Sequence, residues 1–227
     1  GMGLIIVAVG SLAGQIEFSV LAAAVSLTTL FNIAIALRGY SSNVARSMLM
    51  YLVLGQLPAI ALGLYLLSHL SNHAVAVLEL LLGLFLLIGS LSMVYQPRPL
   101  KHASSVPACV VAGIAGGVTG GLFSASGPVM GWFAYRQPLE LNTIRATLLS
   151  YFAVACTIRT LMVGTTGGLN QEVWKLAGIA IPLTIFASWL GVVAKPPVRE
   201  ATLKRTVFVL LMMMAIYIVV SALDALT

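Results

Sequence analysis

Long apolar runs separated by short polar connections dominate the pattern of this chain. A run of about 20 mainly apolar residues is long enough to cross the hydrocarbon core of a bilayer. The runs of this length are residues 18–37, 47–68, 74–95, 146–163, 173–194 and 206–223. In lipid a spanning segment must satisfy its own backbone polar groups, so each run is predicted to be a helix. We therefore expect an all-α, polytopic membrane protein.

Composition and charge agree with this interpretation. Hydrophobic residues make up 60% of the 227 residues and charged residues only 8%, whereas a soluble domain is roughly 25% charged. The net charge of +6 does not indicate nucleic-acid binding, because the basic residues lie between apolar runs and form no patch. Cys109 and Cys156 lie in apolar stretches, and no Cys/His cluster has metal-ligand spacing. We expect no metal and no cofactor.

Lysine and arginine occur on alternate connections between the runs. Two connections, residues 68–74 and 165–172, carry none. The others carry ten of the twelve basic residues: Arg38, Arg46, Arg98, Lys101, Arg136, Arg145, Lys195, Arg199, Lys204 and Arg205. Basic loops stay on the cytoplasmic side. This pattern predicts a multi-pass protein of the inner membrane.

The segment 103–135 has no charge and is interrupted by glycine and proline. Both of its flanks are basic, so it is predicted to enter the membrane and return to the cytoplasmic side. At 33 residues it suits two half-helices that meet at the glycine-rich bend. Broken backbone at this depth is stable only when protein or a water-filled cavity surrounds it. The alternative is a glycine-flexed hairpin with a packing role alone.

A shift of 124 positions relates the two halves of the sequence. It places Ser26 on Ser150 and Pro58 on Pro182. Each half has three full spans, an odd number, which predicts two inverted-topology repeats of the kind common in secondary transporters. Repeat 1 would cover residues 1–97, a cytoplasmic linker 98–105, and repeat 2, with the re-entrant segment, 106–227. Residues 4–14 match the second arm of that segment, so repeat 1 is expected to lack its first half-helix, through truncation or because the native chain is longer.

Two stretches resemble the sulfite exporter TauE/SafE family of membrane permeases. The first is Gly-Gly-Val-Thr-Gly-Gly-Leu-Phe-Ser-Ala-Ser-Gly-Pro-Val-Met at 116–130, and the second begins with Arg-Ala-Thr at 145–147. The family typically shows a turn ending in Gly-Gly-Gly or Gly-Gly-Pro and then a helix that opens in this way. Ser126 stands where the family often has glycine, and the matching turn of repeat 1 is absent. The resemblance implies transport of sulfite, sulfonates such as sulfoacetate, or related organic anions.

The glycine-rich bend is the first candidate for an anion site. Helix starts expose unpaired N–H groups and the positive end of the helix dipole. Gly120, Gly121 and Gly127 would permit close backbone approach, and Ser124 and Ser126 would add hydroxyl donors. The alternative is that these glycines serve only the packing of helices against one another.

Two repeat-related helices carry polar residues at helical spacing. Ser26, Thr29 and Asn32 lie three apart on one helix, and Thr147 and Ser150 lie three apart on the other. Such groups line a substrate path or, equally, bond to their own helix or hold helices together. Asn32 is the strongest candidate because an amide in the middle of a span needs partners.

Arg159 is the basic residue placed well inside a span. An ionisable residue within the membrane is a candidate functional residue by default. The alternative is that Arg159 snorkels to the outer surface. Arg145, at the cytoplasmic border, is either an orientation signal or a residue that attracts the anion. Gln56 and Pro58 are interpreted as a packing kink.

These observations favour a secondary transporter that moves a small anion by alternating access. No phosphate-binding loop, nucleophile elbow or catalytic carboxylate pair is present in the sequence, so a membrane enzyme is disfavoured. A scaffold or assembly factor that transports nothing is the other alternative. The expected partners are the anion and the lipid bilayer. A coupling ion (proton or sodium) and a homodimer stay open.

Overall fold

The computed structural model describes residues 18–37, 43–94, 99–193, 209, 212–213 and 215–223, and this part of the chain contains helices and no strand. The prediction of an all-α protein is therefore confirmed. The helices are α2 (Phe18–Leu37), α3 (Arg46–His73), α4 (Val75–Val94), α5 (Val106–Phe123), α6 (Gly127–Tyr135), α7 (Leu141–Thr165) and α8 (Gln171–Val193), followed by a helical segment at 215–223.

The helix bounds follow the apolar runs, and α2 coincides with its predicted range. Helix α7 begins at Leu141 rather than 146, because the polar first turn is also helical. Three stretches, Arg46–Leu70, Val106–Phe123 and Leu141–Thr165, are long and apolar enough to cross a membrane by themselves. Residues 4–14, predicted to match one arm of the re-entrant segment, lie outside the described residues.

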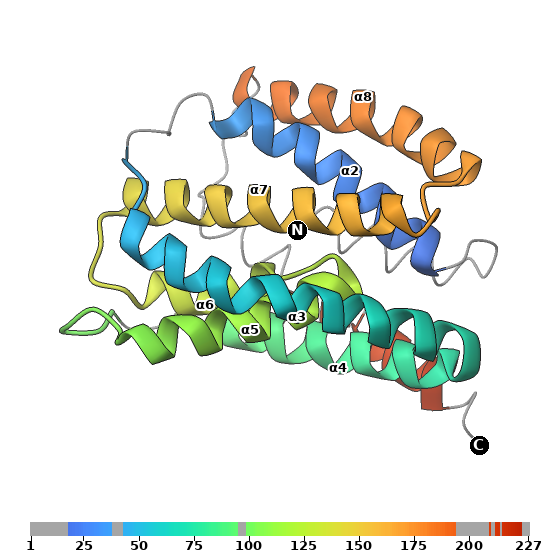
Figure 1. The fold of residues 1–227 in the computed structure, drawn as a ribbon, viewed down its shortest axis with the longest axis horizontal. Helices are drawn as coiled ribbons and strands as arrows, with labels where there is room; N and C mark the ends of the chain where they lie inside the picture. The colour runs from blue at the N-terminus through green and yellow to red at the C-terminus, as the bar shows by residue number, and fades with distance from the viewer. Residues whose placement is uncertain are drawn as a thin grey trace.

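The helices run alternately between the two ends of the bundle (Figure 1). Helices α3, α5 and α7 run in one direction, and α2, α6 and α8 run in the other. The described basic residues of the connections, Arg46, Lys101, Arg136 and Arg145, fall at the end where α3, α5 and α7 begin. We call this the basic end. The connections after α3 and α7 lie at the opposite end, as the charge pattern predicts.

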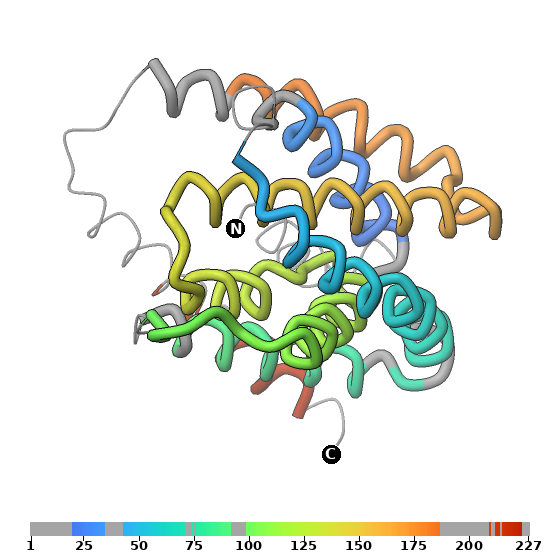
Figure 2. The backbone as a smooth tube through the Cα atoms, turned by 60° about the vertical axis from the view of Figure 1, so that its left-hand side comes forward, coloured from blue at the N-terminus to red at the C-terminus, as the bar shows by residue number. Residues whose placement is uncertain are grey.

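Two layers make up the bundle. Helices α2 and α8 lie over α7 on one side, and α3, α5, α6 and α4 form the other side (Figure 2). On the outer edge, Leu78, Leu82 and Leu86 of α4 pack against Ala215 and Ile218 of the C-terminal helical segment. This arrangement leaves α2, α3, α5 and α7 to enclose the centre of the molecule.

Helices α5 and α6 form a hairpin whose two ends meet at the basic end. The Leu100 N–H donates to the Arg136 carbonyl oxygen at 2.7 Å. The Gln137 side chain accepts from the Ser104 N–H at 3.0 Å and donates to the Ser104 hydroxyl at 2.9 Å. The helix breaks between the two arms, at residues 124–126.

The arms of this hairpin are unequal, with 18 residues in α5 and 9 in α6. At a rise of 1.5 Å per residue, these lengths are about 27 Å and about 14 Å. The expected half-helix therefore describes α6, whereas α5 is long enough for a full crossing. Helix α5 continues through its paired glycines because they are buried against neighbouring helices, and tertiary packing overrides a weak helix propensity.

Candidate functional site

Glycines bring the backbones of α3 and α5 into direct contact. A Cβ on Gly121 would lie 2.6 Å from the Ile60 carbonyl oxygen and 2.9 Å from Gly63 Cα. A Cβ on Gly117 would lie 2.7 Å from the Gln56 carbonyl oxygen. Neither position can hold a larger residue. On the face of Gly121 that meets α3, the glycine therefore serves the packing of helices against one another, which was the alternative to an anion site. The carbonyl group of Gly121 has a second role.

Arg159 lies in the centre of the bundle and is 2% exposed. Its Nε donates to the Gly121 carbonyl oxygen at 3.2 Å, and its Nη1 donates to the Ala22 carbonyl oxygen at 2.8 Å and to Ser26 Oγ at 2.7 Å. The guanidinium therefore joins α7 to α2 and α5. The snorkelling alternative is wrong, because the side chain points to carbonyl groups inside the protein.

Ser26 and Ser124 complete the polar cluster around Arg159. Ser124 ends α5 in the left-handed conformation, with φ 55° and ψ 24°, and its N–H donates to the Gly120 carbonyl oxygen at 3.0 Å. Its hydroxyl donates to the Ala22 carbonyl oxygen at 2.6 Å and lies 2.9 Å from Ser26 Oγ. Two serines predicted from distant parts of the sequence thus meet at the same arginine.

The Nη2 group of Arg159 is buried and has no hydrogen-bond partner among the residues that the structure describes. Within the described part of the chain, its bonding partners are two carbonyl oxygens and one hydroxyl, and no carboxylate. A buried charge is costly unless it is paired. The site therefore has one formal positive charge and a buried two-hydrogen donor group that no described residue pairs.

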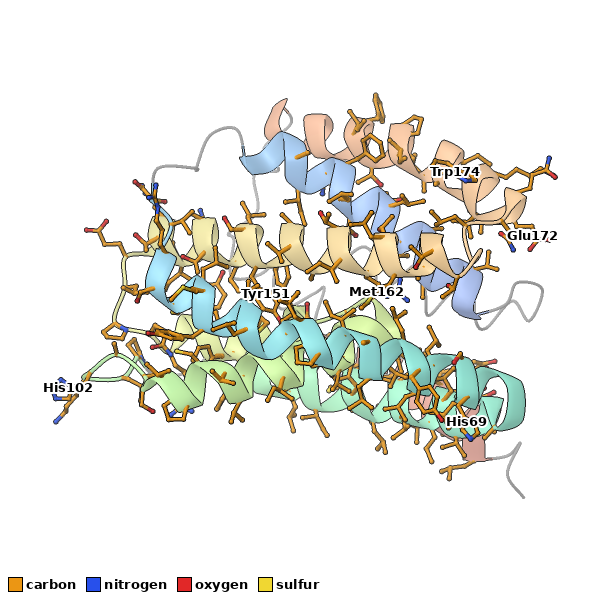
Figure 3. All side chains as sticks on the ribbon, in the orientation of Figure 1. His69, His102, Tyr151, Met162, Glu172 and Trp174 are labelled. Carbon is orange, nitrogen blue, oxygen red and sulfur yellow. The ribbon has the colours of Figure 1, made fainter. Side chains whose placement is uncertain are left out.

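A cavity of about 560 Å³ leads from the opposite end of the bundle to Arg159. Its walls come from the start of α2, the second half of α3, the last turns of α7 and the connection to α8: Val20, Ala61, Leu64, Tyr65, Leu67, Ser68, Met162, Val163, Thr165, Thr166, Gly168 and Asn170. Arg159 is the charged residue of this lining. Met162, on the wall, lies farther from the basic end than Tyr151 does (Figure 3).

Five other predicted site residues lie away from the cavity. Thr147 is buried near the basic end, where its hydroxyl donates to the Thr143 carbonyl oxygen at 2.7 Å and accepts from the Ala45 N–H at 3.0 Å. It therefore connects the start of α3 to α7. Arg145 is exposed two residues before Thr147, and Ser150, Thr29 and Asn32 are half-buried and do not line the cavity.

The remaining predicted residues lie on either side of the helix break: Gly120 near the end of α5, and Ser126 and Gly127 at the start of α6. Ser126 is buried, and its carbonyl oxygen accepts from the Met130 N–H at 3.0 Å. A Cβ on Gly120 would touch Ser126 at 3.6 Å, whereas a Cβ on Gly127 would meet nothing within 4 Å. None of the three lines the cavity. The structure thus brings Ser26, Gly121, Ser124 and Arg159 together, whereas the start of α6 lies outside this cluster.

Sequence reasoning did not identify Gln56 as a buried polar group. Gln56 of α3 is 0% exposed, and within the described residues neither its amide nitrogen nor its amide oxygen has a hydrogen-bond partner. The argument that favoured Asn32, an amide in the middle of a span, applied equally to Gln56. The neighbouring Pro58 directed the interpretation to a kink instead.

Comparison with known proteins gives the family of this chain. The sequence profile described as "Sulfite exporter TauE/SafE" matches residues 1–218. The chain belongs to this family. A relative from Cupriavidus necator, named "Probable sulfite/organosulfonate exporter TauE", is 37% identical over 208 residues, which are 92% of this chain and 81% of that protein. No solved structure matches the chain. The resemblance seen in the glycine-rich stretch is confirmed, and a family of exporters also confirms a membrane transporter rather than an enzyme.

Proposed function

We propose that this protein exports sulfite, an organosulfonate or a related small organic anion across the inner membrane as a secondary transporter, with Arg159 as the counter-charge for the substrate. The observation that carries the proposal is the unpaired Nη2 of Arg159, a residue that lines the cavity. The guanidinium presents planar, paired N–H donors that match the oxygen atoms of sulfite, sulfonate and carboxylate groups. The substrate class comes from the family and from the name of the Cupriavidus necator relative.

The surroundings of Arg159 support binding of an anion rather than a purely structural role. Its Nε and Nη1 groups are fully used by α2 and α5, which fixes the orientation of the guanidinium plane. The free donors are thereby preorganised, and preorganisation lowers the cost of binding. Ser26 and Ser124 stand beside the guanidinium as further hydroxyl groups.

The directions of the helices support the inverted repeat. Under the shift of 124, α2 corresponds to α7 and α3 to α8. The members of each pair run in opposite directions along the bundle (Figure 1). We assign residues 1–97 and 106–227 to the two repeats, and the hairpin of α5 and α6 to the re-entrant element of the second. Movement of one repeat against the other would expose Arg159 to each side in turn.

Flux of labelled anions into proteoliposomes tests the proposal. Sulfite and sulfoacetate should both be tried, under proton and sodium gradients. Arg159→Gln should abolish flux, because it removes the counter-charge. Lys175→Gln is the matched control, since Lys175 is an exposed basic residue that lies within a span and outside the cavity. Absence of flux for every anion under every gradient would favour a scaffold, and wild-type flux in Arg159→Gln would remove Arg159 from the site.

A further inference from the structure

Helices α3 and α5 keep one register along their contact, and side chains of α7 meet α5 at two points of it. On α3, the carbonyl groups of Leu52, Gln56 and Ile60 face the Gly113, Gly117 and Gly121 positions of α5, each pair 61 residues apart. On α7, the Tyr151 hydroxyl lies 3.5 Å from the Gly113 carbonyl oxygen, and Arg159 Nε bonds to that of Gly121 at 3.2 Å. All three helices run in the same direction (Figure 1). Steps of four residues along parallel helices therefore define successive layers.

Three layers follow from this register. The first, nearest the basic end, contains Leu52, Gly113 and Tyr151; the second contains Gln56, Gly117 and Ala155; and the third, at the cavity, contains Ile60, Gly121 and Arg159. Ala155 is placed in the second layer because it lies midway between Tyr151 and Arg159 on α7. Gln56 is thus one helix turn, about 6 Å, inward from Arg159.

Gln56 is the long polar side chain of its layer, since Gly117 and Ala155 are small. Both polar atoms of its amide are buried and lack a partner in the described part of the chain. Leaving buried polar groups unsatisfied costs free energy, and such groups in native proteins call for an explanation. An apolar residue of similar size would avoid this cost, so packing alone does not account for glutamine here.

We propose that the Gln56 amide is a second contact for the transported anion, which the substrate reaches after leaving Arg159 on its way between the cavity and the basic end. This proposal depends on the function proposed above. The amide NH₂ group supplies two donors to anion oxygens, as Arg159 Nη2 does, but carries no charge. A neutral contact holds an anion less tightly than a guanidinium, so the anion is stabilised during passage without being trapped. The Tyr151 hydroxyl is the next polar group inward, one layer farther.

Substitution of Gln56 separates binding from flux. Gln56→Leu and Gln56→Met keep the approximate size and remove the hydrogen-bond donors. Loss of a hydrogen bond to a charged group corresponds to a fall of about tenfold or more, and we expect this fall in sulfite and sulfoacetate flux through proteoliposomes. Binding of the same anions to purified protein should stay within about twofold of wild type, because Arg159 is untouched. Leu57→Met, at an exposed position next to Gln56, is the matched control.

Thermal unfolding of the variants adds a readout that a structural role would move differently. Removing an unsatisfied amide should leave the unfolding midpoint unchanged or raise it, so low flux cannot then be attributed to misfolding. If one variant fails to fold, flux through the other tests the proposal, because leucine and methionine differ in shape. Wild-type flux in a folded Gln56 variant, with flux abolished in Arg159→Gln, would overturn this inference alone. Wild-type flux in both would overturn the function proposed for Arg159 as well.

Discussion

The two ends of the α3, α5 and α7 contact differ in what surrounds them. Toward the opposite end, the layer of Arg159 opens into the cavity of about 560 Å³. Toward the basic end, Tyr151 is 0% exposed and packs with Leu52, Met130 and Leu148 in one apolar cluster. The same three helices therefore provide a polar layer that borders the cavity on one side and a buried apolar layer on the other.

This difference comes from α7 rather than from the helix backbones. The glycines of α5 meet α3 in the same way at Gly113 and at Gly121. What changes is the residue that α7 presents to them, a tyrosine in one layer and an arginine eight residues later. Because the backbone contact between α3 and α5 is uniform, α7 can provide Arg159 in one layer and the buried Tyr151 that closes the other.

The largest effect on anion binding is expected from Arg159→Lys, on the side of the three helices that borders the cavity. Lysine keeps the charge but lacks the planar fork that bonds to α2, α5 and the anion at once. Affinity for sulfite should fall by about 2 kcal/mol or more, the usual cost of breaking a buried charge pair. Titration of purified protein with the anion measures this change. Arg145→Lys is the control, because Arg145 is exposed at the basic end, and equal losses in both variants would contradict the assignment.

For stability rather than binding, the largest effect is expected at the sealed side, from Tyr151→Ala. Emptying this site should lower the free energy of unfolding by about 3–5 kcal/mol, as for other large aromatic-to-alanine changes. It should also let a thiol reagent reach Cys109, which is buried in the same cluster. Labelling is followed in a Cys156→Ser background with and without the Tyr151 change. Unchanged protection of Cys109 would show that Tyr151 does not seal this end.

A smaller effect is expected from Gly121→Ala. This change tests the close backbone contact between α3 and α5, which the two layers share. The added methyl group would meet Ile60 O and Gly63 Cα, and such overpacking typically costs about 1–3 kcal/mol. Gly178→Ala is the control, because a Cβ there meets nothing within 4 Å. Chemical or thermal unfolding of both variants gives the comparison. Equal stability of the two would contradict the backbone contact described here.

The smallest effect is expected from a pair of changes at Ser124. Ser124→Ala removes the hydroxyl bonded to the Ala22 carbonyl oxygen and keeps the left-handed strain, whereas Ser124→Gly removes the hydroxyl and relieves that strain. Unfolding measurements should show the glycine variant to be more stable than the alanine variant by about 0.5–1 kcal/mol. The reverse order would mean that the conformation of Ser124 is not left-handed.

Much of the helical frame could be predicted from the sequence, because each helix is specified by its own apolar run. The range of α2 was predicted correctly in this way. Residues Ser26, Ser124 and Arg159 were each singled out locally. Their meeting could not be predicted, since contacts between residues 98 and 133 positions apart depend on how whole helices pack.

Other predictions were ambiguous where local patterns had two equally good explanations. Thr147 matched the polar spacing of a substrate path, yet it connects α3 to α7 near the basic end. The glycine pairs of α5 predicted a bend, yet the helix ends only at Ser124. The register that places Gln56 between the layers of Tyr151 and Arg159 depends on how three helices pack. That packing could not be deduced from the residue pattern of any one helix.

Anion-dependent thermal unfolding tests the central claim, that Arg159 pairs with the substrate at the floor of the cavity. A ligand that binds only the folded state stabilises it by about 2.7 kcal/mol at 100 times its dissociation constant. For the wild-type protein, the unfolding midpoint should rise with sulfite or sulfoacetate concentration, and for Arg159→Gln it should stay constant. An equal rise in both proteins, or no rise in the wild type with either anion, would contradict the claim.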